Sequence, residues 1–494
     1  MKFYSTRDSK KTEFTSAEVI KKGLADDGGL FVPETIPLFT NDEIQSYCSM
    51  SYAELAAAVL EKFLSDYSHD ELIEDTKIAY ENGTFPTDPC PLYKVDESSY
   101  SLELWHGPTC AFKDMALQIM PRLLSRSLVK TGEKRDALVL VATSGDTGKA
   151  ALEGYCDVDR IKIAVFYPEN GVSTMQKLQM ATQTGSNVHV SAVEGNFDDI
   201  QTGVKKVFSN SDYAAELDSL GYFLSSANSI NFGRLAPQIV YYVKSYCDLL
   251  NKGAISYGDF INVCVPTGNF GNILAAYITK LMGLPIKKLI CASNSNNILT
   301  DFLRTGVYDT NRNFRTTMSP SMDILISSNL ERLLYFICGA DQTAEYMKSL
   351  KEDGKYQVSD EIKAEIDKNL VGYYADEYET MTAVREMHDN FNYLIDTHTG
   401  VAFSALEQYR NETKDNTVTV VASTANPYKF AHDVHDSIYD DIPLTDLRAF
   451  AELERRSKVE PPAQLKDLPS REIRFNGCIA PDDIYNEVLR FINK

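Results

Sequence analysis

Short apolar, β-rich runs that alternate with helical runs are the feature that most constrains the fold of this chain. Beyond residue 95, such runs predict strands at Tyr100–Trp105, Ala137–Thr143, Ile161–Tyr167, Val188–Val193, Phe260–Val265, Lys288–Ala292 and Thr417–Ala422. The helices predicted between them include Val172–Thr184, Phe197–Phe208, Phe232–Leu250 and Ile273–Met282. This pattern is typical of parallel sheets covered by helices on both faces, and it predicts an α/β fold. Ligands of such sheets bind at the carboxyl ends of strands, so the chemistry should lie in loops that directly follow strands.

The chain length of 494 residues predicts more than one domain. Residues 1–95 are predicted to form a mixed, mostly helical N-terminal domain, which ends in a linker at Asn82–Leu92 with three prolines and one glycine. We expect an α/β domain over residues 96–230 and a larger α/β domain over 231–494. Within the larger domain, the acidic and Tyr-rich stretch Gly339–Met387 predicts an added helical region.

Charge and cysteine usage exclude several classes of protein. A net charge of −21 argues against a protein that mainly binds nucleic acid or anionic membrane. No run reaches the ~18 apolar residues that a membrane-spanning helix needs, and the N-terminus lacks the apolar core of a signal peptide. The nine cysteines are scattered without a C-x-x-C pair, which predicts reduced thiols, a cytoplasmic protein and no metal site. His432 and His435 are interpreted as polar helix surface, and the sequence leaves a monomer or a homodimer open.

A lysine follows the first predicted strand, in the segment His106–Asp114. Gly107 and Pro108 predict a turn, and a helical run begins after Lys113. Burial beside Phe112 and a helix N-terminus would both lower the pKa of Lys113 and leave its amine available for a Schiff base. The alternative is a surface lysine paired with Asp114.

Two glycine-containing loops also follow predicted strands and precede helices. In Ala142–Gly148, backbone N–H groups and the hydroxyls of Ser144 and Thr147 could hold a carboxylate or a phosphate. Val265–Asn272 has glycines at 268 and 271 but matches neither G-x-G-x-x-G nor a P-loop, which favours a small phosphate monoester over a dinucleotide or ATP. Either loop could also be an ordinary strand–helix turn, and the two anion assignments could be exchanged.

The combination of these features suits pyridoxal phosphate. A buried-type lysine, a phosphate-binding loop and a second anion loop match a cofactor that itself supplies the electron sink. After the last predicted strand, the hydroxyl-bearing turn Ser423–Pro427 could contact a heterocycle, although a helix-capping turn is the alternative.

The chain resembles the threonine synthase family of fold-type-II pyridoxal-phosphate enzymes. The resemblance rests on KGLADDGGLFVPE (22–34), HGPTCAFKDMALQ (106–118), TSGDTG (143–148), SSANSINFGRLAPQ (225–238), PTGNFGN (266–272) and STANPYKF (423–430). It implies that Lys113 binds the cofactor and acts as acid and base, and that Thr424 contacts the pyridine nitrogen. The implied donors to the cofactor phosphate are Gly268, Asn269, Phe270, Gly271 and Asn272. The implied substrate-binding residues are Ser144, Gly145, Asp146, Thr147, Asn228, Asn231 and Arg234.

The resemblance also implies a reaction, the conversion of O-phospho-L-homoserine and water to L-threonine and phosphate. Many fold-type-II enzymes have asparagine at the place of Asp146, which leaves its contact with the cofactor's ring hydroxyl open. The segment Asp396–Gly400 is expected to begin a helix near the site. Two alternatives remain: a phospho-lyase that yields 2-oxobutanoate, and a protein that binds the cofactor without turnover.

Overall fold

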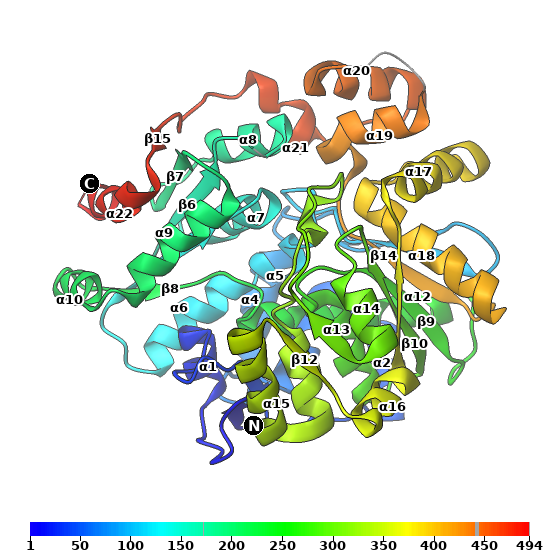
Figure 1. The fold of residues 1–494 in the computed structure, drawn as a ribbon, viewed down its shortest axis with the longest axis horizontal. Helices are drawn as coiled ribbons and strands as arrows, with labels where there is room; N and C mark the ends of the chain where they lie inside the picture. The colour runs from blue at the N-terminus through cyan, green and yellow to red at the C-terminus, as the bar shows by residue number, and fades with distance from the viewer. Residues whose placement is uncertain (171, 440–443, 494) are drawn as a thin grey trace.

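Two mainly parallel β-sheets, each covered by helices, make up most of the molecule (Figure 1). The structure is a computed structural model, and it describes residues 1–170, 172–439 and 444–493. The α/β fold predicted from the alternation of strands and helices is confirmed, since each predicted strand is present with boundaries shifted by at most a few residues.

The larger sheet has six strands in the order β13-β10-β9-β14-β4-β3. Its strands are β3 (Leu92–Lys94), β4 (Ser99–Glu103), β9 (Ile261–Pro266), β10 (Ile286–Ser293), β13 (Leu370–Tyr374) and β14 (Thr419–Ser423). Neighbouring strands are parallel except for β3, which pairs antiparallel with β4. Strands β4, β9 and β14 are buried along their whole length. This burial explains the mostly apolar sequences of β9 and β14, whereas β4 also buries Ser99, Ser101 and Glu103.

The smaller sheet has five parallel strands in the order β15-β7-β6-β5-β8. Its strands are β5 (Asp136–Ala142), β6 (Ile161–Pro168), β7 (Val188–Val193), β8 (Tyr222–Ser225) and β15 (Cys478–Ile479). Leu138, Leu140 and Phe166 on one face pack into an apolar cluster with side chains of the C-terminal helix such as Val488. The end of the chain therefore completes a sheet that begins more than 300 residues earlier.

The predicted helices are present, with one break. They correspond to α8 (Thr174–Ala181), α9 (Phe197–Ser209), α11 (Phe232–Leu235), α12 (Pro237–Asn251) and α13 (Gly271–Leu281). The helix predicted over Phe232–Leu250 is divided between α11 and α12, because Pro237 has no N–H and starts a new helix as its first residue.

Further helices surround the two sheets and the N-terminal segment. They are α1 (Ser16–Lys22), α2 (Asn41–Tyr47), α3 (Tyr52–Glu61), α4 (His69–Tyr80), α5 (Asp114–Leu117), α6 (Met120–Lys130), α7 (Asp146–Tyr155), α10 (Ser211–Ser219), α14 (Ile298–Thr305), α15 (Leu330–Asp353), α16 (Asp360–Asn369), α17 (Glu377–Phe391), α18 (Thr397–Thr413), α19 (Ala431–Ile438), α20 (Asp446–Ser457), α21 (Ala463–Lys466) and α22 (Ile484–Ile492). None of the described helices is long and apolar enough to cross a bilayer.

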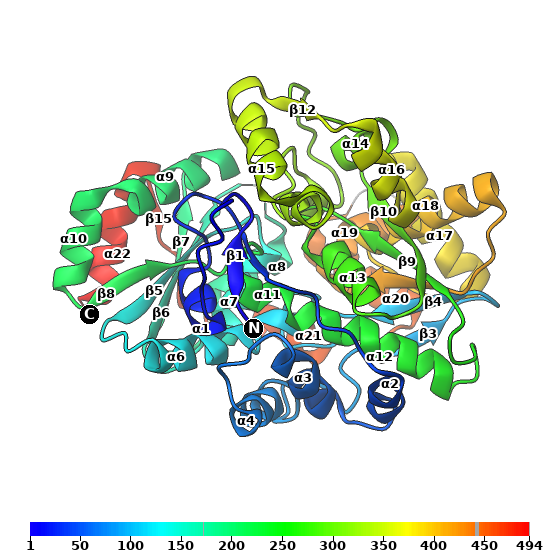
Figure 2. The ribbon, with the colours of Figure 1, turned by 90° about the horizontal axis from the view of Figure 1, so that it is seen from below.

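The N-terminal segment combines an antiparallel pair, β1 (Phe3–Ser5) and β2 (Phe31–Pro33), with helices α1 to α4. Helices α2, α3 and α4 lie together on one side of the molecule, beside α12 (Figure 2). Each of α1 to α4 starts with a capping box, in which a Thr or Ser side chain and a Glu three residues later satisfy exposed N–H groups. The regular structure of this part of the chain is therefore four helices and one short strand pair.

The sheets draw on distant parts of the chain. Strand β4 lies in the larger sheet beside β14, although it falls in the predicted 96–230 domain. Strand β15, near the C-terminus, joins the smaller sheet. The three domain ranges stay a prediction, and these two strands connect them.

The stretch Gly339–Met387 is more than an added helical region. It contributes β13, which pairs in parallel with β10 at the edge of the larger sheet. The stretch is largely helical, but the sequence does not predict β13, because β13 has only five residues and acidic helices flank it. Gly372 allows the close approach of α14, since a Cβ there would lie 2.8 Å from the Cα of Thr300.

Candidate active site

Lys113 lies at the start of α5, in a loop that crosses the carboxyl end of β14. The loop is fixed by the Phe112 N–H, which donates to the carbonyl oxygen of Thr424 at 2.8 Å, and by a β-bridge between Ala111 and Ala425. The Lys113 side chain is buried, and its Nζ lies 4.8 Å from the centroid of the Phe112 ring. Burial lowers the pKa of Lys113 to about 8; Asp146 opposes this shift, while Lys429 and Arg234 contribute to it. The amine is therefore poised for chemistry near neutral pH.

Asp114 does not pair with Lys113, so the alternative of a surface ion pair was wrong. The Asp114 carboxylate accepts hydrogen bonds from the Thr109 N–H at 2.8 Å and from the Thr109 hydroxyl at 2.6 Å. Burial raises the pKa of Asp114 to about 6, although these hydrogen bonds oppose the shift. Asp114 therefore holds the turn that presents Lys113.

Asp146 lies between two buried lysines. Its Oδ2 is 3.8 Å from Lys113 Nζ, and its Oδ1 accepts from Lys429 Nζ at 2.8 Å and from Gln176 Nε2 at 2.9 Å. Burial alone would raise the pKa of Asp146, but the Lys429 and Lys113 ammonium groups lower it well below its usual range. The carboxylate is therefore ionised. Lys429 was missed from the sequence as a site residue, although it lies in the quoted motif STANPYKF.

The loop of residues 143–148 follows β5 and begins α7. Thr143 closes it, because its hydroxyl oxygen accepts from the N–H groups of Gly145 at 3.0 Å and Gly148 at 2.9 Å. Gly145 has a φ of 138°, which a side chain would strain. Ser144 and Thr147 are partly exposed, so their hydroxyls are available to a ligand.

The loop of residues 266–272 follows β9 and begins α13, whose N-terminus is buried. Phe270, the residue before the helix, has a left-handed φ of 62°, and no side chain of the described residues caps the helix there. The first N–H groups of any helix lack carbonyl partners within it, so this buried end needs an acceptor. The Asn272 Nδ2 is also buried without a partner in the described part of the chain, while its Oδ1 accepts from the Tyr242 hydroxyl.

Carbonyl oxygens of this second loop are held from the segment before α15. Ser327 Oγ donates to the Gly268 carbonyl at 2.7 Å, and Asn329 Nδ2 donates to the Asn269 carbonyl at 2.9 Å. A Cβ at Gly268 would lie 2.6 Å from the Ser321 carbonyl oxygen, so only glycine fits. The loop is therefore fixed with its carbonyl groups engaged and its helix end available to an anion.

The three predicted phosphate donors of the substrate differ in their surroundings. Asn228 is exposed. Asn231 is buried and already committed to the fold, since its Oδ1 accepts from the Gly233 N–H and its Nδ2 donates to the Ile20 carbonyl, both at 2.9 Å. Arg234 donates from Nη1 to the Ala227 carbonyl at 2.7 Å, and its Nε has no hydrogen-bond partner among the described residues. Burial lowers the pKa of Arg234 to about 10.

Thr424 is buried at the end of β14, beside the lysine loop. Its neighbour Ser423 accepts a hydrogen bond from the Trp105 indole at 3.0 Å. The structure thus places Thr424 next to Lys113 through the Phe112 contact, and its contact with a pyridine nitrogen stays a prediction.

Ser321 and His398 were missed as site residues. Lys113 Nζ donates to Ser321 Oγ at 3.4 Å, and the Ser321 N–H donates to His398 Nε2 at 3.1 Å. The His398 Nδ1 lies 2.7 Å from an Asp396 oxygen, and this arrangement assigns its ring proton to Nδ1. The segment Asp396–Gly400 begins α18 near the site, as predicted. Through His398 it holds Ser321, which faces Lys113.

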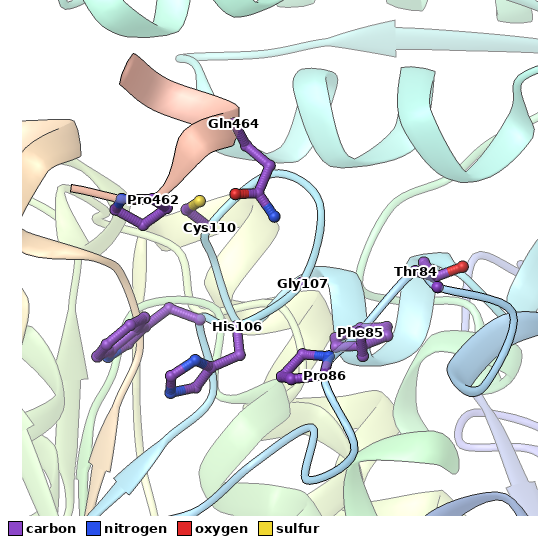
Figure 3. Close-up of a pocket in the computed structure, with 10 residues that line it drawn as sticks. Thr84, Phe85, Pro86, His106, Gly107, Cys110, Pro462 and Gln464 are labelled. Carbon is purple, nitrogen blue, oxygen red and sulfur yellow. The ribbon is translucent and has the colours of Figure 1, made fainter. Parts of the chain in front are cut away.

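A cavity of about 370 Å³ borders the segment that precedes Lys113 (Figure 3). Gly107 and Cys110 of that loop line it together with the linker residues Thr84, Phe85 and Pro86, with Trp105 and His106, and with Pro462 and Gln464. Trp105 was interpreted as a core residue; it is instead partly exposed and stacks on His106 with ring centroids 4.2 Å apart.

These features fit pyridoxal phosphate. An uncapped, buried helix N-terminus and the unpartnered Asn272 amide suit the cofactor's phosphate, and the buried Lys113 amine suits its aldehyde. Together with the two parallel sheets, they define the class of fold-type-II pyridoxal-phosphate-dependent enzymes. Residues 91–424 match the family described as "Pyridoxal-phosphate dependent enzyme".

The ends of the chain narrow the family. Residues 2–80 match "Threonine synthase N terminus" and residues 399–483 match "Threonine synthase, C-terminal". The chain is 37% identical to a threonine synthase of Pseudomonas aeruginosa over 481 residues, which cover 96% of this chain and 95% of that one. The chain belongs to the threonine synthase family.

Other relatives agree with this placement. The crystal structure of pyridoxal-phosphate-bound threonine synthase from Brucella melitensis has a TM-score of 0.88 at 35% identity, and covers 100% of both chains. Threonine synthase from yeast has a TM-score of 0.90 at 32% identity, covering 100% of this chain and 98% of that one. Human "Threonine synthase-like 1" is 39% identical over 427 residues, which cover 84% of this chain but 57% of that relative.

Proposed function

We propose that the chain is a threonine synthase, a carbon–oxygen lyase acting on phosphates that converts O-phospho-L-homoserine and water to L-threonine and phosphate in threonine biosynthesis. The observation that carries the proposal is the arrangement of two separate anion loops, 143–148 and 266–272, around one buried amine. A cofactor phosphate and a substrate carboxylate need two such sites.

The chain would hold pyridoxal phosphate through its own donors. The N–H groups at the start of α13, in the segment Gly268–Asn272, would bind the phosphate, Lys113 would bind the aldehyde, and Thr424 would contact the pyridine ring. When bound, the cofactor supplies the electron sink that makes carbon–hydrogen bonds next to the substrate amine acidic.

The substrate would bind through two sets of groups. Ser144, Gly145 and Thr147 supply donors for the substrate carboxylate at the start of α7, and Asp146 lies between this loop and Lys113. The leaving phosphate is doubly charged at neutral pH, and fixed donors stabilise its departure. Arg234, with a buried guanidinium nitrogen that has no partner in the described chain, is the best donor, with Asn228 and Asn231 beside it.

Lys113 Nζ would move the protons of the reaction. Because the pKa of Lys113 is lowered to about 8, roughly a tenth of the amine is unprotonated at pH 7. That fraction can accept the proton from the substrate α-carbon, and the resulting ammonium can return a proton later in the cycle. Ser321 Oγ, 3.4 Å from Nζ, orients the amine.

The test is a paired assay on the purified protein with O-phospho-L-homoserine, in which phosphate and threonine are quantified in the same sample. Equal amounts of the two products support a threonine synthase. Phosphate with 2-oxobutanoate identifies the phospho-lyase, and bound cofactor without phosphate release identifies a protein without this activity.

Localisation and assembly are parts of the same proposal. We propose a cytoplasmic protein that acts as a monomer or a homodimer on a small molecule, without nucleic-acid or membrane partners. All nine cysteines are free thiols, and the net charge of −21 disfavours anionic polymers as partners.

A further inference from the structure

Lys429 connects three of the sequence motifs that form the site. It lies in the short helix Pro427–Phe430, directly after the turn that carries Thr424, and its side chain is fully buried. Its Nζ donates to Asp146 Oδ1 at 2.8 Å and to the carbonyl oxygen of Thr109 at 2.9 Å. Thr109 belongs to the lysine loop and Asp146 to the first anion loop. Lys429, which follows β14, thus contacts the loops that follow β4 and β5.

The position of Asp146 close to Lys113 favours the protonated form of that lysine, and Lys429 opposes this effect. A buried carboxylate 3.8 Å from Lys113 would, by itself, form an ion pair and keep the lysine protonated. A protonated lysine has no lone pair with which to attack an aldehyde or accept a proton. The Asp146 carboxylate has, however, a closer partner in Lys429.

We propose that Lys429 is a positioning residue that takes up the charge of Asp146 and so leaves the amine of Lys113 free to react. The inference deepens the proposed function, because it rests on the cofactor-binding role of Lys113 but not on the identity of the substrate. The other charged groups near Lys113 are Arg234, which adds to the effect of Lys429, and Asp114, whose carboxylate is bound by Thr109.

The experiment measures how uptake of the cofactor depends on pH. The full-length protein is stripped of cofactor with hydroxylamine, pyridoxal phosphate is added back over a range of pH, and the visible absorbance of the lysine-bound cofactor is recorded. In Lys429→Met, Asp146 pairs with Lys113, so we expect the pH midpoint of uptake to rise by about one unit or more. Lys429→Arg keeps the charge and should stay close to the wild type.

Two controls separate this role from general damage to the fold. Lys149 is a third buried lysine. It lies on α7 and pairs with Glu153 at 2.8 Å. Lys149→Met removes a buried lysine from a partly exposed ion pair and should leave the midpoint unchanged. Asp146→Asn should lower the midpoint, since Lys429 then repels an unpaired Lys113, and the double variant Asp146→Asn/Lys429→Met should return it towards the wild type.

The double variant also keeps the test valid if Lys429→Met fails to fold, because it removes the Asp146 carboxylate together with the Lys429 ammonium that pairs with it. Its midpoint must then lie above that of Asp146→Asn. An unchanged midpoint in Lys429→Met, or equal midpoints in Asp146→Asn and the double variant, overturns the inference. A wild-type protein that takes up the cofactor but makes no threonine overturns the proposed function alone.

Discussion

The two glycine-containing loops at 143–148 and 266–272 have nearly the same local design but different electrostatics. Both follow a buried parallel strand and begin a helix, α7 or α13, whose N-cap residue makes no side-chain cap hydrogen bond, although the Thr143 hydroxyl accepts from the Gly148 N–H in the first turn of α7. The first loop, however, places the ionised Asp146 in the first turn of its helix. The second loop contains no titratable side chain. The sequence pattern alone does not say which loop binds the cofactor phosphate and which binds the substrate carboxylate. The charge distribution favours one assignment.

The difference indicates which anion each loop suits. A doubly charged phosphate is repelled by a carboxylate in the same turn, so the second loop is the better phosphate site. The first loop suits a single carboxylate, with hydroxyls of Ser144 and Thr147 as donors and with Lys429 and Lys113 nearby to balance Asp146. Support from outside each loop also differs. Ser327 and Asn329 hold the carbonyl groups of the second loop, and Arg332 holds Asn329 through a 2.5 Å hydrogen bond.

Lys113→Ala is expected to have the largest effect on turnover. It tests the role of the amine while both loops stay intact. Turnover should fall on the order of 10³-fold or more, because the group that binds the cofactor covalently and moves protons is lost. The phosphate loop is intact, so the variant should still bind pyridoxal phosphate non-covalently. Product release and the visible spectrum are measured together. Wild-type turnover with an unchanged cofactor spectrum would remove Lys113 from the mechanism.

Arg234→Ala tests whether the substrate phosphate has its own site. Loss of a charged donor costs about 1.5–3 kcal/mol, so KM for O-phospho-L-homoserine should rise roughly tenfold to a hundredfold. The affinity for pyridoxal phosphate should stay the same, and Arg234→Lys should recover part of the loss. Steady-state kinetics at saturating cofactor give the answer. If the variant instead loses the cofactor, the assignment of the two phosphate sites is wrong.

The pH dependence of cofactor uptake distinguishes covalent binding to Lys113 from non-covalent binding to the phosphate loop. Below the Lys113 pKa of about 8, the unprotonated amine falls tenfold for each pH unit, and covalent uptake should slow in proportion. In Lys113→Ala, non-covalent binding should be nearly constant between pH 7 and 9, since a phosphate monoester with a second pKa of about 6 stays a dianion. Stopped-flow absorbance and equilibrium titration measure the two. A wild-type profile that keeps rising tenfold per pH unit up to pH 10, without levelling off above pH 8, would mean that burial does not lower the pKa of Lys113.

The framework of the fold was predictable because long, buried strands leave a continuous apolar signal. Strands β5, β6 and β9 appear in the sequence as runs that no amphipathic helix would produce. Strand β13 did not, because five residues between acidic helices carry too weak a pattern. Nor did β15, a two-residue pairing that forms only when the chain end returns to β7. Edge strands depend on tertiary contacts rather than on local sequence.

The residues of the candidate site also fall into two groups, those that the sequence predicts and those that it misses. Lys113 and the second loop come after strands of the larger sheet, and the first loop comes after a strand of the smaller sheet, so topology places each at the carboxyl end of its own sheet. Ser321 and Lys429 come from segments whose position depends on how several elements pack. His398 acts through the Ser321 N–H, a contact between segments 77 residues apart that spacing cannot reveal. The sequence therefore points to the residues that we propose to contact ligands, whereas the residues that hold them in place are found only in the structure.

The finest comparison removes one supporting hydroxyl from each loop. Ser327→Ala releases the Gly268 carbonyl, and Thr143→Val releases the N–H groups of Gly145 and Gly148. Each loss costs about 1 kcal/mol, or roughly fivefold in affinity. Ser327→Ala should weaken binding of pyridoxal phosphate while KM for the substrate at saturating cofactor stays unchanged, and Thr143→Val should do the reverse. Cofactor titration gives the affinity for pyridoxal phosphate, and substrate kinetics give KM, for each of the two variants. If the pattern is exchanged, the first loop holds the cofactor phosphate, and the repulsion argued from Asp146 is overcome by Lys429 and Lys113.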